Sequence, residues 1–527
     1  MELLGRSFIG YSTGVTGGRV FTAINPATNE ALSPAFHSAL PAELDCAAQL
    51  AAQAFESSSR ASGKEKASFL RAIAQGLEGI TGDLITRVNQ EAALPEARVR
   101  SEAARTAFQL RLFADLVEEG SWVRARLDRP NPSRTPPKPD LRSMWRPLGP
   151  VVVFGASNFP LAYSVAGGDT ASAFAAGNPV IVKAHPAHPG TSELVGNVIR
   201  SAARACKMPD GIFSLLFDAG TEAGTALVRH PLVRAVGFTG SQRGGRALMD
   251  LAAARPAPIP VFAEMGSTNP VFILPGAMAA RGEQIAEGLH GSVTLGAGQF
   301  CTKPGLVFLP AAPEAAAFAR NLARRIAETP APVMLTPGIH AAYVASVAAR
   351  SKREGVSLAA QGKSIAGEPG VRGAPALFTT DAHAFIAQPE LAEEVFGPAA
   401  LVVHCGRREE MLEIARGLQG HLTATIHGTE EDLRNYRELV EILEQKAGRL
   451  VFNGYPTGVE VGHAIVHGGP YPATSDGQST SVGSQAIYRF ARPVCFQNFP
   501  HAALPPELQD ANPLGIWRRT DGVLGKS

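Results

Sequence analysis

Short apolar runs that alternate with alanine-rich, helix-like stretches are the feature of this chain that most restricts its fold. The alternation extends from about residue 150 to residue 261. It predicts βαβ units around a parallel sheet, because strands that run in the same direction need a crossover connection, which a helix supplies. The runs are Val151–Phe154, Pro179–Val182, Ile212–Phe217, Ala235–Phe238 and Pro260–Ala263.

The same alternation resumes after Glu264 and predicts a second α/β unit, with apolar runs at Val271–Leu274, Gly305–Leu309 and Ala399–His404. Residues 40–116 are alanine-rich with apolar residues at helical spacing, which predicts helices. Residues 127–139 are rich in proline, which indicates an extended connector or a sheet edge. A chain of 527 residues is too long for one ordinary core, so two or three domains are expected.

The charge and cysteine content exclude several classes of function. The net charge of +2, without a basic block carrying interleaved aromatic residues, gives no indication of a nucleic-acid partner. Five scattered cysteines without a CxxC pair indicate neither a metal site nor a disulfide framework, and they fit a reducing compartment. The sequence shows no signal peptide and no apolar run long enough to span a membrane, so a cytoplasmic protein is expected.

The segment Gly298-Gln299-Phe300-Cys301 carries the strongest chemical signal. Glycines let the backbone approach a reacting group closely, and a cysteine thiolate is a strong nucleophile. Glu264-Met265-Gly266 lies 37 residues upstream and offers a carboxylate that could activate water. Taken alone, the segment is also compatible with a buried structural cysteine, which is the commoner role of a single Cys.

Three further segments favour the catalytic interpretation. Phe154-Gly155-Ala156-Ser157-Asn158-Phe159-Pro160 follows a strand-like run, Pro179–Lys183 ends in a lysine, and Val236–Gly245 enters a glycine-rich turn. Together with Glu264, Cys301 and Glu394-Val395-Phe396-Gly397-Pro398, they resemble the aldehyde dehydrogenase superfamily in order and approximate spacing. The resemblance extends from about Asn25 to about Pro493.

The resemblance implies an α/β fold of three parts. A Rossmann-like cofactor-binding domain would comprise residues 1–126 and 147–262, and a catalytic domain residues 263–470. A small β extension for oligomerisation, together with the C-terminal tail, would comprise residues 127–146 and 471–527, with its last strand near residues 485–492. Such an edge ribbon exposes unpaired backbone groups, so a homodimer or homotetramer is expected.

The resemblance also implies the catalytic roles. Cys301 would add to the aldehyde and form a thiohemiacetal and then a thioester. The Asn158 amide, with the backbone N–H of Cys301, would stabilise the oxyanion, although a turn residue is the usual role of an Asn near a proline. Glu264 would act as the base for thioester hydrolysis, and we expect burial to raise its pKa, unless it forms a salt bridge at a strand end.

Cofactor contacts follow from the same motifs. Lys183 would bind the adenine ribose, Gly240 and Gly245 would bound the turn near the pyrophosphate, and Thr239 would pack against the nicotinamide. Glu394 would hold the nicotinamide ribose, with Phe396 beside it. The complete set of cofactor-binding candidates is Lys183, His185, Thr239, Gly240, Ser241, Gly245, Glu394 and Phe396.

The cofactor is expected to be NADP, with NAD as the alternative. NAD-preferring members of the superfamily commonly carry a glutamate three residues after the ribose lysine, and this chain has Pro186 there. His185 and His188 are candidates for contacting a 2′-phosphate. Against NADP, Asp218 and Glu222 bring negative charge to a turn near the same ribose.

Within the superfamily, four stretches are most similar to the NADP-linked branch that oxidises 2-oxoglutarate semialdehyde (2,5-dioxopentanoate) to 2-oxoglutarate. The stretches are Lys183–Glu193, Gly298–Gly305, Asn453–Val459 and His467–Asp476. NADP-dependent enzymes for medium-chain and long-chain fatty aldehydes share part of this pattern and remain the alternative. A relative that transfers the acyl group to CoA would not need Glu264, and a non-enzymatic member would be expected to lack a catalytic residue.

The substrate residues are the least constrained by the sequence. Phe159, Tyr163, Ala166 and His467 lie where the family lines its substrate tunnel. A substrate carboxylate needs an arginine or a set of fixed donors. Arg105 or Arg111 could provide it from a helix that, by resemblance, borders the tunnel, and the alternative is that they lie on an exposed helix face. No metal ligand is expected, and the sequence does not fix the physiological aldehyde.

Overall fold

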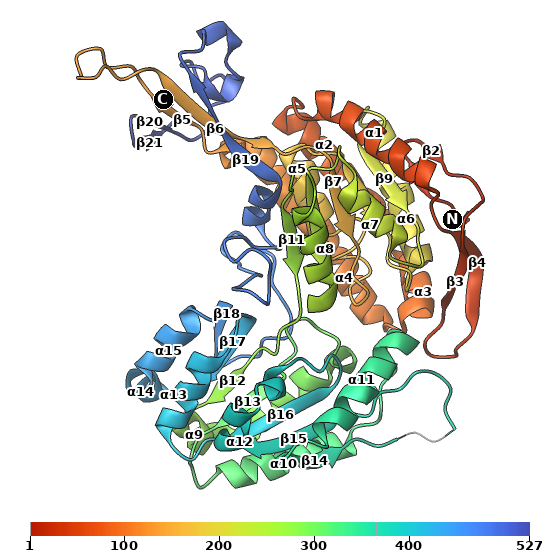
Figure 1. Cartoon of the computed structure of the whole chain (residues 1–527), viewed down its shortest axis with the longest axis vertical. Helices are drawn as coiled ribbons and strands as arrows, with labels where there is room; N and C mark the ends of the chain where they lie inside the picture. Colours follow the sequence, from red (N-terminus) through yellow and green to blue (C-terminus); the bar gives the residue numbers. More distant parts are fainter. Residues whose placement is uncertain (1, 365–366, 527) are drawn as a thin grey trace.

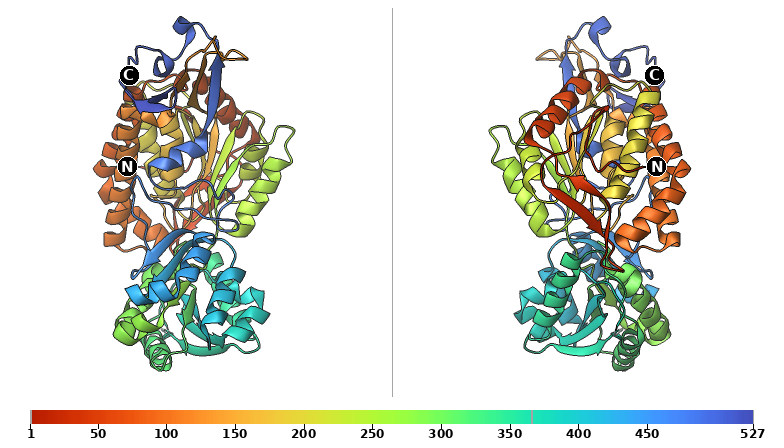
Figure 2. Two further views of the ribbon diagram at one scale, coloured as in Figure 1. Left: turned by 90° about the vertical axis from the view of Figure 1, so that its left-hand side faces the viewer. Right: turned by 90° about the vertical axis from the view of Figure 1, so that its right-hand side faces the viewer.

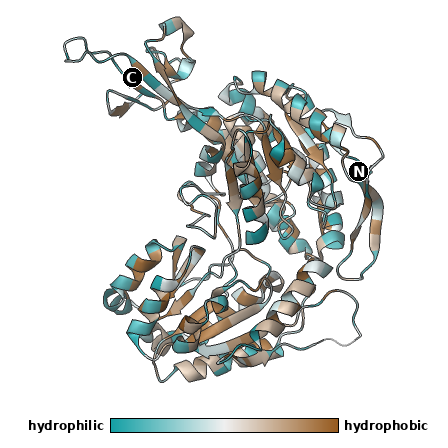
Figure 3. Ribbon diagram, in the orientation of Figure 1, coloured by the Kyte–Doolittle hydropathy of each residue, from teal (hydrophilic) through white to brown (hydrophobic). Residues whose placement is uncertain are grey.

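The computed structural model describes residues 2–364 and 367–526. The chain forms two α/β units, one above the other in Figure 1, and an arm that projects from the upper unit (Figure 1; side views in Figure 2). Strands at the centre of each unit are the most apolar elements, and the helices around them are mixed in polarity (Figure 3). No helix in the described part of the chain is long and apolar enough to cross a membrane.

The upper unit contains a seven-stranded sheet in the order β11-β10-β7-β8-β9-β1-β2. Its five neighbouring strands from β11 to β9 are parallel and confirm the predicted βαβ alternation. They are β7 (Val151–Phe154), β8 (Val180–Lys183), β9 (Phe213–Leu216), β10 (Ala235–Thr239) and β11 (Val261–Glu264). Two short antiparallel strands, β1 (Phe8–Ile9) and β2 (Ser12–Thr13), complete one edge.

Helices cover both faces of this sheet because successive strand residues point to opposite sides. Val151 and Val153 pack in the large core with α2 to α6, whereas Val152 packs in a second core with α1 and α7. The helices are α1 (Pro41–Ser58), α2 (Gly63–Gly79), α3 (Thr81–Ala92), α4 (Glu96–Glu119), α5 (Gly168–Ala176), α6 (Pro189–Ala205), α7 (Glu222–Arg229) and α8 (Gln242–Ala253).

The lower unit contains a second seven-stranded sheet in the order β14-β15-β16-β13-β12-β17-β18, parallel except for β14. Helices α9 and α10 pack on one face, and α11, α12, α13 and α15 on the other. The strands are β12 (Val271–Ile273), β13 (Leu306–Leu309), β14 (Ser357–Gln361), β15 (Ala376–Asp381), β16 (Ala399–His404), β17 (His421–His427) and β18 (Ala447–Phe452). The helices are α9 (Pro275–Thr294), α10 (Ala315–Glu328), α11 (Pro337–Arg350), α12 (Ala382–Ala387), α13 (Arg408–Gly417), α14 (Glu430–Asn435) and α15 (Arg437–Glu444).

The arm is a five-stranded sheet in the order β19-β6-β5-β20-β21. Its strands are β5 (Arg126–Asp128), β6 (Leu141–Pro147), β19 (Ala491–Gln497), β20 (Arg518–Thr520) and β21 (Val523–Gly525). The strand expected near residues 485–492 begins only at Ala491, because residues 484–490 form a mostly buried 3₁₀ turn that packs on α5. A separate hairpin joins β3 (Val20–Ile24) to β4 (Ala31–His37).

Candidate active site

The site lies where the carboxyl ends of the upper parallel strands face the lower unit, which is the usual place for ligands in open α/β sheets. Strand β11 ends at Glu264 and β10 at Thr239, and the loop after β7 carries Asn158. The lower unit supplies Cys301 from the turn that follows α9. A cavity of about 370 Å³ is lined by Ala156, Ser157, Asn158, Thr239, Gly240, Ser241, Glu264, Met265, Gly266, Cys301, Ile339, Ala342, Tyr343, Ser346, Glu394 and Phe396.

The backbone around Cys301 is held tightly. Gly298 has φ of +64°, and a Cβ added there would lie 2.4 Å from the backbone of Gly397. Only glycine fits both constraints. The side-chain amide of Asn269 donates to the carbonyl of Cys301 at 2.8 Å and to that of Lys303 at 3.0 Å. These contacts fix the thiol at the edge of the cavity.

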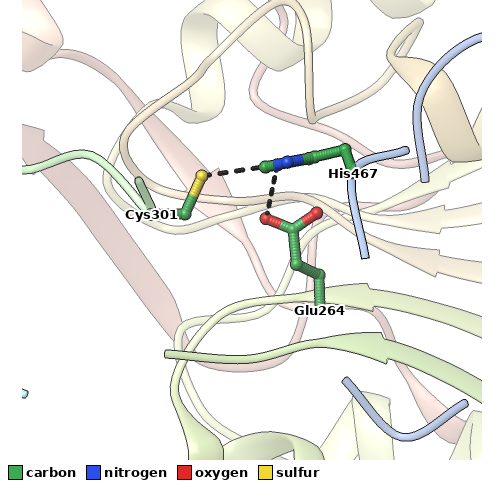
Figure 4. Close-up of side chains that lie close together, drawn as sticks. All are labelled: Glu264, Cys301 and His467. Carbon is green, nitrogen blue, oxygen red and sulfur yellow. Dashed lines mark hydrogen bonds and ion pairs between the residues drawn. The ribbon is translucent and has the colours of Figure 1, made fainter. Parts of the chain in front are cut away.

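Three side chains converge beside the cavity (Figure 4). The Sγ atom of Cys301 lies 3.5 Å from Nε2 of His467, and the same nitrogen lies 3.0 Å from Oε1 of Glu264. The other carboxylate oxygen of Glu264 accepts a hydrogen bond of 2.6 Å from the hydroxyl of Ser481. His467 therefore lies between the thiol of Cys301 and the carboxylate of Glu264, and not simply along a tunnel wall.

This environment moves the two pKa values in opposite directions. Burial and the adjacent carboxylate of Glu264 raise the pKa of the Cys301 thiol well above its usual range. Burial acts on the pKa of Glu264 in the same upward direction, but His467 and the hydrogen bonds from His467, Ser481 and Cys301 outweigh it, and the pKa falls below its usual value. Our expectation of a raised pKa for Glu264 was wrong because the sequence did not reveal these partners.

Asn158 lies at the cavity wall close to the cysteine segment. Its side-chain amide donates to the carbonyl of Gln299 at 3.0 Å, and its second amide hydrogen is left for another acceptor. Phe159, the next residue, packs edge-on against Phe300, with ring centroids 5.4 Å apart, and against Tyr163 at 5.1 Å. The loop after β7 and the cysteine segment are thus held in contact by one amide and an aromatic cluster.

Five of the predicted cofactor residues line the cavity, namely Thr239, Gly240, Ser241, Glu394 and Phe396. The Ser241 hydroxyl caps α8 by accepting from the backbone N–H of Gly244 at 3.2 Å, so the helix N-terminus faces the cavity rim. Burial raises the pKa of Glu394 to about 7, although Lys303 opposes the shift. Gly245 contributes by packing, because a Cβ there would lie 2.6 Å from Sδ of Met265.

The remaining cofactor candidates lie at the end of β8. Burial lowers the pKa of the Lys183 amine, and Asp218 and Glu222 oppose that shift. Burial, His188 and Lys183 lower the pKa of His185 well below its usual value, so His185 is neutral at pH 7. His188 is buried, and its ring nitrogens contact the carbonyl of Ala156 at 2.7 Å and the Ser192 hydroxyl at 3.3 Å. His188 is therefore not available to a phosphate, contrary to our expectation.

The two candidate arginines have different surroundings. Arg105 donates to the Tyr163 hydroxyl at 3.2 Å and to the carbonyl of Val459 at 3.3 Å, and its charge interacts with Cys301. Arg111 is 42% exposed and binds Glu78 through both terminal nitrogens at 2.6 and 2.7 Å. The structure brings Arg105 to the site and leaves Arg111 on the outer face of α4, so the suggestion that Arg111 anchors a substrate is not supported.

Sequence reasoning missed two partners of the candidate catalytic residues. Ser481, which orients Glu264, follows Cys301 by 180 residues and belongs to no motif that we recognised. Arg449 interacts electrostatically with Cys301 and Tyr163 and donates to the carbonyls of Pro456 and Gly458 at 2.7 and 3.1 Å. Arg449 and Arg105 hold neighbouring carbonyls of residues 456–459, and no local spacing could have indicated this.

Comparisons with known proteins agree with this geometry. The model of the "Aldehyde dehydrogenase family" matches residues 14–480. The chain is 49% identical over 524 residues to "Alpha-ketoglutaric semialdehyde dehydrogenase 2" of Azospirillum brasilense, covering 99% of each chain. It is 43% identical over 522 residues to "Alpha-ketoglutaric semialdehyde dehydrogenase" of Acinetobacter baylyi, covering 99% of this chain and 98% of the relative.

Solved structures show the same fold. A 1-pyrroline-5-carboxylate dehydrogenase from Thermus with bound NAD aligns with a TM-score of 0.78 at 21% identity, covering 94% of this chain and 92% of that one. HpcC from Thermus thermophilus aligns with a TM-score of 0.78 at 25% identity, covering 94% of this chain and 93% of that one. The α/β fold expected from the sequence is confirmed.

Proposed function

This chain belongs to the aldehyde dehydrogenase family, and from that premise we propose that it oxidises 2,5-dioxopentanoate to 2-oxoglutarate with NADP. The observation that carries the chemistry is the placement of Cys301 and Glu264 at one cavity wall with five cofactor candidates around it. The sequence identity of 49% to a protein named as an alpha-ketoglutaric semialdehyde dehydrogenase supports the assignment of this substrate.

The residues present fit a nicotinamide cofactor. A capped helix N-terminus favours a pyrophosphate, and the buried carboxylate of Glu394 can accept from ribose hydroxyls. A Cβ at Gly266 would lie 2.1 Å from Oε2 of Glu394, so glycine leaves the room that this carboxylate occupies. When bound, the cofactor accepts the hydride that leaves the substrate carbon.

Cys301 begins the reaction. His467, 3.5 Å from Sγ, accepts the thiol proton, and the thiolate adds to the aldehyde carbon. The oxyanion that forms receives hydrogen bonds from the backbone N–H of Cys301 and from the second amide hydrogen of Asn158. Loss of hydride from the carbon then leaves a thioester on Cys301.

Glu264 completes the reaction by hydrolysis. Its carboxylate is ionised at neutral pH, because its pKa is below the usual value, and it can take a proton from water after His467 has passed the thiol proton to solvent. The resulting hydroxide attacks the thioester, the acid leaves, and Cys301 returns as a thiolate. Water and the oxidised cofactor are therefore the only co-reactants, and no CoA is consumed.

The decisive assay measures NADPH and NADH formation without CoA. The substrates are 2,5-dioxopentanoate, succinic semialdehyde, glutaraldehyde and a long-chain aldehyde. We expect the highest kcat/KM for 2,5-dioxopentanoate with NADP, since no carboxylate stands at Pro186 to repel a 2′-phosphate. The nearby acids Asp218 and Glu222 make NAD the alternative cofactor. A kcat/KM for NAD more than about tenfold higher would refute the cofactor assignment.

A fatty aldehyde is the second candidate substrate, because an apolar cluster lies beside the site. It includes Ala156, Ala162, Tyr163, Val461 and Val482, with Phe159, Val459 and Ile465 packed against it. A higher kcat/KM for the long-chain aldehyde would move this chain to that substrate class while leaving the Cys301 and Glu264 chemistry intact.

Arg105 is our candidate for binding the substrate carboxylate. Replacing it with Ala should raise the KM for 2,5-dioxopentanoate by about tenfold to a hundredfold, since a hydrogen bond to a charged group contributes roughly 1.5–3 kcal/mol. The KM for a neutral aldehyde should change little. The exposed Arg111→Ala variant is the matched control on the same helix. Equal KM values for both variants with the anionic substrate would remove this assignment.

We further propose that the arm joins subunits into a homo-oligomer. Its edge strands β19 and β21 carry backbone groups that another chain can pair. Several exposed apolar side chains of the C-terminal tail support the proposal, namely Phe499, Leu514, Trp517, Val523 and Leu524.

A further inference from the structure

Cys301, His467 and Glu264 together offer a sulfur, a nitrogen and an oxygen ligand in one place. Their ligand atoms all lie within 4.8 Å of one another, and the three residues come from three separate segments of the chain. Glu264 and His467 are 2% and 1% exposed in their side chains. The sequence did not indicate this cluster, because its members are 37 and 166 residues apart and lack the short spacing of familiar metal motifs.

The distances are close to the edges of a tetrahedral zinc site. Zinc binds sulfur at about 2.3 Å and imidazole nitrogen or carboxylate oxygen at about 2.0 Å, which places neighbouring ligand atoms roughly 3.2–3.6 Å apart. The observed separations are 3.5 Å from Sγ to Nε2 and 3.0 Å from Nε2 to Oε1. Oε1 of Glu264 contacts Nε2 of His467 as an ion pair, and a cation bound between the two atoms would replace that contact.

The three ligands are held in position by their neighbours. The Ser481 hydroxyl contacts both Oε2 of Glu264 at 2.6 Å and the carbonyl of His467 at 3.1 Å. Asn269 holds the carbonyl of Cys301 at 2.8 Å. Such outer contacts orient metal ligands and reduce the entropy lost on binding. Because Glu264 and Cys301 also line the cavity, a fourth position on the metal would open towards it.

We propose that Cys301, His467 and Glu264 bind a zinc ion that reversibly blocks the thiol. Binding replaces the thiol proton with zinc, releases that proton to solvent and involves no oxidation or reduction. A thiolate bound to zinc cannot add to an aldehyde, so zinc inhibits the enzyme until a chelator removes it. Mg²⁺ and Ca²⁺ prefer an all-oxygen site and do not compete. The inference rests on the ligand geometry and does not depend on the identity of the aldehyde or cofactor.

Co²⁺ is the probe that reports on this site without an activity assay. A cobalt–thiolate bond gives a near-ultraviolet charge-transfer band, which we expect when the reduced, metal-free protein is titrated with Co²⁺. Zn²⁺ should abolish the band by displacement, and Mg²⁺ should not. In parallel, Zn²⁺ should inhibit reduced-cofactor formation, and a chelator should restore it.

Four variants test whether the band arises at this site. The Cys301→Ser variant should lose the charge-transfer band. The His467→Ala variant should bind Co²⁺ more than about tenfold more weakly. The Ser481→Ala variant should show the same loss of affinity, because it keeps every ligand but loses the contacts that orient them. The matched control replaces the other accessible thiols, Cys46, Cys206 and Cys495, with Ser and should keep the band.

The proposal is overturned if the band persists in Cys301→Ser or if His467→Ala binds Co²⁺ as tightly as the parent protein. Should His467→Ala fail to fold, as judged by circular dichroism, the Ser481→Ala affinity decides in its place, and an unchanged affinity overturns the proposal. If the protein oxidises none of the aldehydes but still shows a Co²⁺ band that depends on Cys301 and His467, the proposed function is refuted and this inference stands.

Discussion

At the residue scale, two buried glutamates at one cavity have pKa values displaced in opposite directions. The pKa of Glu264 falls because His467, Ser481 and Cys301 surround its carboxylate. Burial raises the pKa of Glu394 to about 7, and the charge of Lys303 offsets only part of that rise. The Lys303 amine donates hydrogen bonds to the carbonyls of Val395 and Ala399. Partners, more than depth of burial, determine the charge of each carboxylate.

The Glu264→Gln variant should separate the two halves of the reaction. The thioester should still form, so a burst of reduced cofactor close to one per site is expected in the first turnover. Steady-state turnover should fall by about 10²–10⁴-fold, because the base for hydrolysis is lost. Rapid-mixing absorbance at the reduced-cofactor band measures both phases. A loss of the burst itself would assign Glu264 to the first half of the reaction.

Cofactor affinity should depend on the charge of Glu394. A carboxyl with a pKa of about 7 is protonated below that pH and cannot accept from two ribose hydroxyls. The Kd for the cofactor should therefore rise by up to about tenfold as the pH falls from 8 to 6, because only roughly a tenth of the carboxyl is ionised at pH 6. Calorimetric titration across this range measures it. The Glu394→Gln variant is the control and should show a flat profile.

The sequence predicted single residues where a motif carries them and missed those placed by tertiary contact. Cys301, Glu264 and Asn158 were identified from their order in the chain, and the structure brings all three to the cavity. His467 was assigned only to a tunnel wall, although it contacts both Cys301 and Glu264. A histidine at residue 467 and a glutamate at residue 264 show no relation until the chain folds.

At the scale of elements, the turn that carries Cys301 depends on glycine. Replacing Gly298 with Ala should cost at least about 1–2 kcal/mol for the left-handed backbone, and the added Cβ would lie 2.4 Å from the Gly397 backbone. We expect a lower Tm and a loss of activity greater than about tenfold. Gly291→Ala in α9 is the matched control, because its Cβ would meet nothing within 4 Å. Comparable losses in both variants would contradict this role for Gly298.

Elements with a strong hydrophobic pattern were predicted well, and elements formed by long-range pairing were not. The five parallel strands from β7 to β11 follow their apolar runs to within two residues. The short strands β20 and β21 escaped detection, since β20 forms only by pairing with the distant β5, and β21 only by pairing with β20. The late start of β19 has the same origin, because packing on α5 holds the preceding residues in a 3₁₀ turn.

At the scale of the whole molecule, the arm leaves apolar side chains and two sheet edges exposed within one chain. Val523 and Leu524 of β21 are 72% and 54% exposed. Replacing both with Asp should weaken subunit association and shift the protein towards smaller species by light scattering after size exclusion. Val15→Asp adds a charge at an equally exposed apolar position outside the arm and should change nothing. An unchanged mass for the double variant would show that β21 lies outside the interface.

The path of the chain through the active site also has a consequence for its synthesis. A ribosome adds Cys301 long before His467 and Ser481, the residues that surround its thiol in the finished protein. At roughly 5–20 residues per second, about 10–30 s separate the cysteine from its histidine. During that interval the nascent thiol has neither the histidine that contacts it nor the serine that hydrogen-bonds to Glu264. The emerging polypeptide is therefore expected to be catalytically silent at least until Ser481 has been translated.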